Sequence, residues 1–542
     1  MLEARRSYRG FAALLALGGV ACSIRHPGEV SAPVPASAPP SAHQAAAPVT
    51  DADTAAHVAQ ERITVSSDSA IVRAMIAEGT LRSHVGADLA YLSDVIGPRL
   101  TGSAAVGHAN AWTVQKFHEY GLDSAWTESY RFGRSWERGP LTLALVAPYT
   151  RQLIGASWAW APGTDGPETG EVVYVDALTP AEYSARFAST VRGKWVMTRP
   201  PAFVWNPDGP PMMAEDSARS DSLRRAFAMA NASPDLVQYR QSLPFRLAND
   251  GALGLINDGA KDFGLLTMSG SPSSLFPLPM VVVPHETFTL FHRLLAGGQK
   301  VTMRADIANS LSADTVDAQN TVAELRGTTK PGEIVLVGAH LDSWDLASGT
   351  TDNGAGAMAV LEAARILKAS GAHPARTIRF VLFTGEEEGL YGSQAYAEEH
   401  ERDLKNYQAV LAIDNGTGRI TGISLQGHDE LRDGWRAMFV PIESLGPFAV
   451  RSRDKGGTDH LSFIPYGVPS FNYDQETRGY NHTHHSQVDT YDYAVPGDLR
   501  QAATVMAVNA YQLATTPEFL SRGKATIVVG GDTARAPAGT TR

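Results

Sequence analysis

Residues Ile334–Asp345 (IVLVGAHLDSWD) decide the fold, because in them a short apolar run leads directly into a histidine and two aspartates. The same arrangement returns at Ile378–Glu388 (IRFVLFTGEEE) and at Val410–Asn415 (VLAIDN), and a further run follows at Val468–Asn472 (VPSFN). Short apolar runs of this kind are typical of buried strands. Residues Gly356–Ser370, between the first two runs, carry apolar side chains at helical spacing. The sequence therefore predicts an α/β fold, a mostly parallel mixed sheet flanked by helices.

Residues 140–318 have a different sequence pattern, which predicts a second, β-rich domain inserted into the first. Short β-like runs alternate there with turns, at Gly170–Val175, Gly193–Met197, Ala252–Ile256 and Leu278–Val283. A polar stretch, Pro207–Leu243, interrupts them. The α/β domain would then comprise residues 61–139 and 319–520, followed by a tail at 521–542. A chain of 542 residues is also too long for one ordinary core.

The N-terminus predicts an export signal. Arg5, Arg6 and Arg9 precede an apolar run, Phe11–Ala21, that is too short to span a membrane. Cys22, the only cysteine in the chain, follows at once. Residues 1–22 therefore resemble a lipoprotein signal, although Gly19 stands where such signals prefer Leu, and an ordinary signal with an incidental cysteine is the alternative. The Pro-, Ala- and Ser-rich residues 23–60 read as a disordered tether. We expect an exported protein of the cell envelope or periplasm, lipid-anchored at Cys22 or else secreted.

The overall composition excludes several classes of partner. Hydrophobic residues make up 43% of the chain and charged residues 19%, which is ordinary for a globular protein. The net charge of −11, with no basic run after the first ten residues, argues against nucleic acid as a partner. No internal stretch approaches 18 consecutive apolar residues. We therefore expect membrane contact only through the N-terminal lipid.

Potential metal ligands follow the predicted strands. His340, Glu387 and Asp414 each come directly after an apolar run, and the carboxyl ends of parallel strands meet at one edge of a sheet. Asp352 lies in a Gly-rich turn (SGTTDNGAG, 348–356), and His485 lies in NHTHHSQVDT (481–490). Each residue alone has an ordinary explanation as a cap or a solvated side chain. Their coincidence at one edge predicts a zinc site, since imidazole and carboxylate ligands suit that metal.

The charges of this set suit two zinc ions. Three carboxylates and one bridging hydroxide neutralise the four positive charges of two Zn²⁺, and one carboxylate must then bridge the metals. Glu386 remains as the adjacent base that takes a proton from water. Asp342, two residues after His340, is placed to accept the other N–H of the imidazole.

Six segments together resemble the zinc aminopeptidase and glutamate carboxypeptidase family of two-zinc exopeptidases, in particular its carboxypeptidase Q branch. They are GAHLDSWD (338–345), TTDNGAG (350–356), TGEEEG (384–389), DNGT (414–417), GTDHLSF (457–463) and HHSQVDT (484–490). Outside these, IGPRLTGS (96–103), SWERG (135–139), RGKWVM (192–197) and NTVAELRG (320–327) resemble that branch in the same order. The resemblance extends over roughly residues 68–515.

The resemblance implies a role for each residue that matches a family motif. His340 and Asp414 would hold one zinc ion, Glu387 and His485 the other, and Asp352 would bridge both. Glu386 would be the general base, and the peptide bond after Asp352 would be cis. The inserted residues would form a protease-associated-like domain. Because carboxypeptidase Q-like members cleave unblocked dipeptides and tend to be homodimers, we expect short peptide substrates and a homodimer.

Some positions depart from the family pattern. His484 stands where many relatives have a Tyr thought to polarise the scissile carbonyl, so His484 is expected to do so here. His485 is chosen over His482 and His484 as the ligand because it lies four residues before Asp489. We expect Asp489 to position the metal ligands without binding the metal itself. TGEE replaces TAEE, and the Pro207–Leu243 stretch has no recognised counterpart.

Two questions remain for the substrate side of the site. Asp459, in GTDHLSF, is expected to contact substrate. Arg451, Arg453 and Lys455 could anchor a substrate carboxylate, but a solvated basic turn is the favoured interpretation.

Glutaminyl cyclisation with one zinc ion and a binding protein without metal are the competing functions. The complete ligand set favours hydrolysis, and the acidity of the site favours substrates with a free ammonium group.

Overall fold

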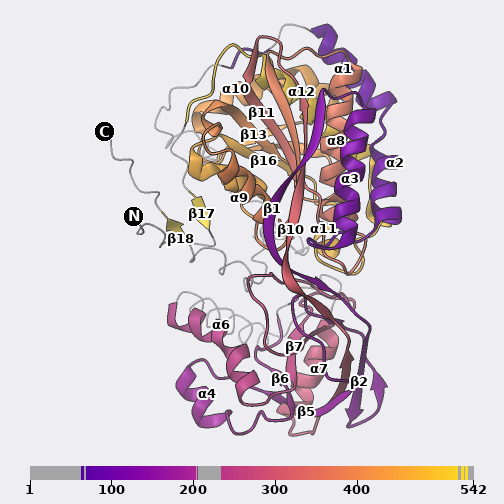
Figure 1. Cartoon of the computed structure of the whole chain (residues 1–542), viewed down its shortest axis with the longest axis vertical. Coiled ribbons are helices and arrows are strands. Elements are labelled where there is room, and N and C mark those ends of the chain that lie inside the picture. The colour runs from indigo at the N-terminus through magenta and orange to yellow at the C-terminus, as the bar shows by residue number, and fades with distance from the viewer. Residues whose placement is uncertain are drawn as a thin grey trace, which may run out of the picture.

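The computed structural model describes residues 63–65, 69–202, 204, 234–522, 527–529 and 532–534. The predicted signal, the lipidation at Cys22, the tether and the larger part of the Pro207–Leu243 stretch lie outside these residues. Figure 1 shows two lobes, the upper one built on the predicted α/β sheet and the lower one on a second sheet. No helix in the described part of the chain combines the length and apolar character needed to cross a membrane.

The upper sheet has eight strands, in the order β1-β10-β12-β11-β13-β16-β14-β15. The central strands β12, β11, β13 and β16 run parallel. Strand β10 is antiparallel to both β1 and β12, and β14 is antiparallel to β16 but parallel to β15. The strands are β1 Ser124–Glu137, β10 Ser310–Leu325, β11 Lys330–His340, β12 Arg376–Phe383, β13 Tyr407–Ala412, β14 Ile420–Ser424, β15 Ala449–Arg451 and β16 Ser470–Gln475.

Helices cover both faces of this sheet, which confirms the predicted fold class. The helices of the upper lobe are α1 Ser69–Leu81, α2 Val85–Ala90, α3 Ala104–Glu119, α8 Ala355–Ala369, α9 Tyr391–Glu399, α10 Arg432–Phe439, α11 Tyr480–Thr483 and α12 Pro496–Thr515. Val335 and Val337 point to the face covered by α8 and α12, while Ile334 and Leu336 point to the face covered by α9. This alternation is the period-two pattern of a strand buried on both faces.

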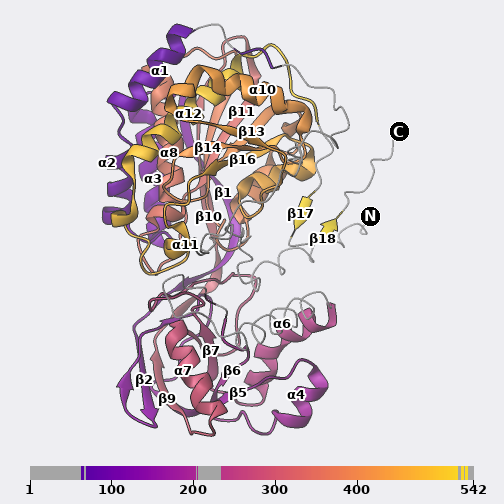
Figure 2. The ribbon, with the colours of Figure 1, turned by 180° about the vertical axis from the view of Figure 1, so that it is seen from behind.

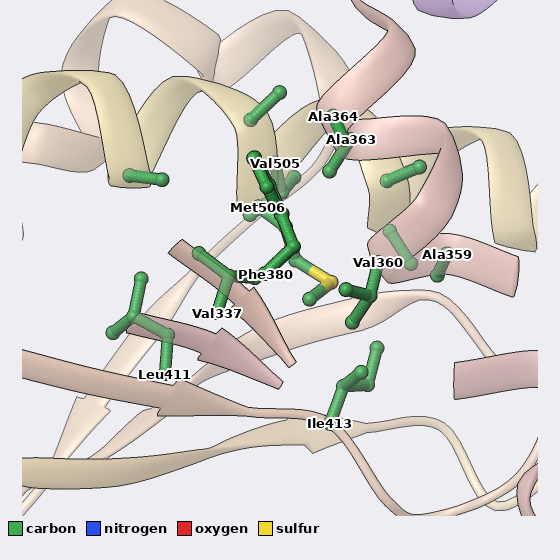
Figure 3. Close-up of a cluster of buried hydrophobic side chains, with 14 of the residues drawn as sticks. Val337, Ala359, Val360, Ala363, Ala364, Phe380, Leu411, Ile413, Val505 and Met506 are labelled. Atoms are coloured by element: carbon green, nitrogen blue, oxygen red, sulfur yellow. The ribbon is translucent and has the colours of Figure 1, made fainter. Parts of the chain in front are cut away.

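The main core lies between the sheet and the helices α8 and α12. Figure 3 shows Val337, Phe380, Leu411 and Ile413 from the strand side facing Val360 and Ala363 of α8 and Met506 of α12. Helix α8 is buried along nearly its whole length, and its alanines let α12 pack closely against it. This core fixes the central strands, and with them the edge where the predicted ligands lie.

The lower lobe contains a second eight-stranded sheet, in the order β3-β2-β9-β5-β6-β7-β8-β4. Its strands are β2 Leu141–Ala147, β3 Arg151–Gln152, β4 Ala156–Ser157, β5 Glu168–Tyr174, β6 Lys194–Met197, β7 Gly254–Asp258, β8 Met280–Val283 and β9 Thr302–Ile307. Helices α4 Pro180–Arg186, α6 Pro234–Asn249 and α7 His285–Ala296 belong to this lobe (Figure 2). The predicted division at residues 140 and 318 stays a prediction, although all these strands fall between β1 and β10 in sequence.

The long strands β1 and β10 pair antiparallel and run from one lobe to the other (Figure 1). An aromatic cluster that includes Phe132, Trp136, Trp160 and Trp344 packs where the lobes meet. Strand pair β17 Ile527–Val529 and β18 Asp532–Ala534 forms a separate two-stranded sheet.

The predicted strand Val468–Asn472 begins too early by two residues. Strand β16 starts at Ser470 and continues to Gln475. Pro469 has no backbone N–H and cannot donate to the ladder, although its carbonyl accepts from the Val410 amide at 2.9 Å.

Candidate metal centre

The predicted ligands meet at the carboxyl edge of the upper sheet. His340 is the last residue of β11, and Glu387 and Asp414 lie in the loops that follow β12 and β13. Asp352 lies in the turn η2 Thr350–Gly354, just before α8, where its own backbone is not helical, and His485 follows the short helix α11. The parallel order of β12, β11 and β13 explains why residues so far apart in sequence share one place.

One half of the centre surrounds the imidazole of His340. Its Nε2 atom lies 3.3 Å from Oδ1 of Asp414 and 3.5 Å from Oδ1 of Asp352. Oε2 of Glu386 lies 3.9 Å from the same nitrogen. His340 is 1% exposed, so these carboxylates gather around a nitrogen shielded from water.

The other half surrounds His485. Its Nε2 atom lies 2.9 Å from Oε2 of Glu387 and 3.5 Å from Oδ2 of Asp352. His484 stacks on His485 and brings its own Nε2 to 3.8 Å from Oδ2 of Asp352. Asp352 thus directs one carboxylate oxygen toward each half, which is the arrangement that a bridging ligand requires.

Two trios of side chains have ligand atoms all within 4.8 Å of one another. They are His340 with Glu386 and Asp414, and Asp352 with His484 and His485. Glu387 falls outside both trios and joins the centre through its short contact with His485. The structure therefore brings all five predicted ligands together, and it adds Glu386 and His484, the predicted base and carbonyl-polarising residue.

The polar atoms of the centre fit a metal. Oδ2 of Asp352 and Oε1 of Glu387 are buried without a hydrogen-bond partner, a costly condition for a carboxylate in the absence of a cation. Burial raises the pKa of Glu386 and of Glu387, and the neighbouring carboxylates raise both further, although His340 opposes this. Burial also disfavours the charged form of His340, but the surrounding carboxylates raise its pKa well above the usual value. A divalent cation would relieve the repulsion in this acidic cluster.

The acceptor for the second nitrogen of His340 differs from the prediction. Nδ1 lies 3.1 Å from the backbone carbonyl of Asp342, whereas the carboxylate of Asp342 is 3.5 Å away. That carboxylate instead accepts from the backbone N–H of Glu387 at 3.3 Å. A backbone acceptor two residues along follows from the turn after β11, which the sequence does not specify.

Asp489 holds the turn that carries Asp352. Its carboxylate accepts hydrogen bonds from the backbone N–H of Thr351 at 2.6 Å and of Asp352 at 3.0 Å. The Asp352–Asn353 peptide bond is cis, as the resemblance implies. These contacts fix the direction of the Asp352 side chain.

Two supporting residues escaped the sequence analysis. Arg99 is fully buried and donates to the backbone carbonyls of Leu341, Ser348 and Gly349, so it joins the loop after β11 to the turn before Asp352. Burial lowers the pKa of Arg99 to about 10. The hydroxyl of Tyr480 donates to Oδ1 of Asp352 at 3.0 Å. The signal for Arg99 was its place in the IGPRLTGS segment.

The residues predicted for the substrate side occupy different surroundings. Asp459 begins the 3₁₀ helix η6 Asp459–Tyr466 and is 1% exposed, and burial raises its pKa to about 7. A small cavity beside the centre is lined by Trp344, Asp352, Glu387, His485, Ser486 and Asp489. Asp459 is not part of that lining, and its contact with substrate stays a prediction.

The basic turn is largely exposed, as the favoured interpretation expects, but its cations are paired with a buried carboxylate. Arg451 and Arg453 each donate to the buried carboxylate of Asp474 at 2.7 Å, and Nζ of Lys455 lies 3.7 Å from it. Asp474 extends from β16, the strand beside β13. Because three cations share one carboxylate, the cluster keeps a surplus of positive charge.

Comparisons with known proteins identify a family and several relatives. A model described as Peptidase family M28 matches residues 320–510. Carboxypeptidase Q from Rattus norvegicus is 30% identical over 444 residues, which cover 80% of this chain and 86% of that protein. The chain belongs to peptidase family M28.

Solved structures of other proteins share the fold. The crystal structure of a Peptidase M28 precursor from Shewanella amazonensis SB2B has a TM-score of 0.68 and 25% identity, and the alignment covers 84% of this chain and 98% of that one. BSAP, a zinc aminopeptidase from Bacillus subtilis, has a TM-score of 0.56 and 19% identity over 81% of this chain and 96% of its own. As an M28 member with these residues at its centre, the chain is a zinc metallopeptidase.

Proposed function

We propose that this M28 peptidase is a two-zinc exopeptidase that hydrolyses short peptides with a free amino terminus. His340 and Asp414 would hold one ion, Glu387 and His485 the other, and Asp352 both. The observation that carries the proposal is the pair of contacts at Asp352, whose two oxygens each lie 3.5 Å from a different histidine, His340 and His485.

The reaction follows from the groups around the centre. When bound, zinc supplies Lewis-acid chemistry at the scissile carbonyl and at a water molecule. Glu386 takes the proton of the attacking water and returns it to the leaving amine, as a general base and then a general acid. Its carboxylate is close enough for this role, because Oε2 lies 3.9 Å from Nε2 of His340. His484 presents an imidazole beside Asp352 that can donate a hydrogen bond to the substrate carbonyl.

The charge of the site supports the choice of substrate. Asp352, Glu386, Glu387 and Asp414 form an acidic edge that attracts an ammonium group in a partly dry cleft. We therefore propose that unblocked dipeptides are cleaved, that N-acetylation abolishes cleavage, and that length beyond a few residues weakens it. A panel of free, N-blocked and C-blocked dipeptides tests this choice. Efficient cleavage of N-acetylated dipeptides with refusal of the free forms would contradict it.

A metal count tests the proposed chemistry separately from the substrate. Zinc measured by atomic emission on purified protein should be close to two per chain. A count near one would favour cyclase-like chemistry, and a count near zero would favour a protein that only binds its ligand.

Export and assembly are proposed on the sequence alone. Lipidation at Cys22 predicts that the protein fractionates with membranes and that Cys22→Ala releases it, because several acyl chains hold firmly where one does not. Wild-type protein found wholly soluble after export would contradict the anchor. A homodimer is proposed as well, and the molar mass from light scattering tests it.

A further inference from the structure

A loop of the lower lobe reaches the ligand histidine of the upper lobe. Residues Gly259–Gly270, between β7 and β8, contact residues 482–487 through six hydrogen bonds. We propose that this loop, here called the β7–β8 latch, holds His485 in position for zinc, with Lys261 and Gln487 as positioning residues. The proposal rests on the proposed two-zinc function and assigns the control of one zinc ion to the inserted part of the chain.

The latch fixes the tautomer of His485. The backbone N–H of Met268 donates to the carbonyl of His485 at 2.9 Å, and Nδ1 of His485 lies 3.0 Å from the carbonyl of Met268. A carbonyl only accepts, so Nδ1 must carry the proton. Nε2 then keeps its lone pair and faces Glu387 and Asp352, which is the state that a zinc ligand needs.

The backbone of His485 also needs outside support. Its φ of +57° is left-handed, a conformation that is uncommon and mildly unfavourable for residues with a side chain. The paired hydrogen bonds with Met268 impose it from the other lobe.

Two side chains close the contact on either side. Nζ of Lys261 donates to the backbone carbonyls of His484 and, at 3.3 Å, of His482. Gln487 accepts from the backbone N–H of Leu266 at 2.8 Å and donates to the carbonyl of Gly264 at 3.1 Å. Lys261 therefore joins the latch to the residues before His485, and Gln487 joins it to the residues after.

The Met268 end of the latch is fixed by the core between the lobes. Met268 is fully buried in the aromatic cluster between the lobes, and its sulfur accepts from the backbone N–H of Ala159 at 3.4 Å. Trp344 of the same cluster contacts the ring of His485, with 5.9 Å between ring centroids. Met268 therefore cannot shift without disturbing this core.

The two ligand histidines therefore depend on different parts of the chain. Nδ1 of His340 is held by the carbonyl of Asp342, two residues away, whereas that of His485 is held across the lobe contact. Loosening the latch should weaken the binding of the zinc ion at Glu387 and His485 and leave the binding of the ion at His340 and Asp414 unchanged.

The double variant Lys261→Met/Gln487→Met tests the latch, since it removes the polar groups and keeps the length of both side chains. Lys300→Met is the matched control, because Lys300 pairs with Glu171 on the same lobe and makes no latch contact. Lys261→Arg keeps a cationic donor and should restore the wild-type behaviour. Zinc affinity is measured by chelator competition, and hydrogen exchange is measured on the metal-free proteins.

We expect the double variant to hold one zinc up to about 10- to 100-fold more weakly and the other unchanged. Its loosened latch weakens the contact between Met268 and His485, and losing such a partner costs a metal-ligating histidine about this much. Excess zinc should restore its kcat. Exchange in residues 480–490 should rise about fivefold without change in α8. Wild-type affinity for both ions in the double variant, or equal loss of both, would overturn the proposal. Wild-type protein that binds no zinc would instead overturn the proposed function, and the exchange data would still decide whether the latch holds His485.

Discussion

The two sheets of this protein each bring an aspartate and a histidine to the carboxyl edge of parallel strands, but only one of these edges is suited to a ligand. At the lower edge, Asp258 accepts from the backbone N–H of Ala202 at 2.8 Å and of Ala260 at 2.9 Å, and Nδ1 of His285 lies 2.9 Å from it. At the upper edge, buried oxygens of Asp352 and Glu387 have no such partner. The residue types are alike and the hydrogen bonds are not.

The difference teaches what separates a structural pair from a metal site. A buried carboxylate that the chain itself satisfies stabilises the fold, whereas one left without donors costs stability and is retained for a ligand. Substitutions at the upper edge should therefore change zinc content and activity. Substitutions at the lower edge should change only the free energy of unfolding.

The largest expected effect comes from Asp352, which faces both halves of the centre. Asp352→Ala removes a ligand from both ions, so both zinc ions and all activity should be lost. His340→Ala removes a ligand from one ion and should retain more zinc. Zinc per chain in the two purified variants is the measurement, and equal losses would reduce Asp352 to an ordinary turn residue.

The next largest effect separates catalysis from metal binding at the same edge. Glu386→Gln keeps a side chain of the same size and removes the base, so both zinc ions should remain while kcat falls about 10²- to 10⁴-fold. Turnover numbers for zinc-replete protein check this. Near-normal turnover would remove Glu386 from the mechanism.

The smallest effect concerns the lower edge. Burial disfavours the charged form of His285, but the hydrogen bond to Asp258 outweighs it and raises the pKa of His285 above 6.5. The charged pair thus stabilises the fold fully below pH 6.5, and its contribution disappears as the pH rises through the raised pKa.

His285→Gln removes this titration. Wild type should exceed the variant by about 1 kcal/mol in free energy of unfolding at pH 6, with the gap closing in alkaline solution. Urea denaturation at several pH values measures it, with zinc content as the control. Loss of zinc from this variant would contradict the claim that the lower edge contributes only to stability.

The sequence predicted the central strands and the place of the ligands because both depend on local patterns. Apolar runs such as Ile334–Val337 and Ile378–Phe383 lie within β11 and β12, and parallel strands carry the residues after them to one edge. Helix α8, predicted at Gly356–Ser370, lies at Ala355–Ala369. The start of β16, at Ser470, was predicted two residues too early because strand pairing, not hydropathy, sets it.

The α/β fold and the residues that meet at the centre could be predicted from strand order and residue type alone, and the quoted motifs sufficed for the resemblance to the zinc aminopeptidase and glutamate carboxypeptidase family. Only the tertiary structure decided which groups hold those residues. Arg99 acts through backbone carbonyls, among them those of Leu341, Ser348 and Gly349, and His485 is held by a carbonyl 217 residues away in the chain. Every residue has a backbone carbonyl, so its role as a partner leaves no mark in the sequence and appears only when folding brings the two segments together.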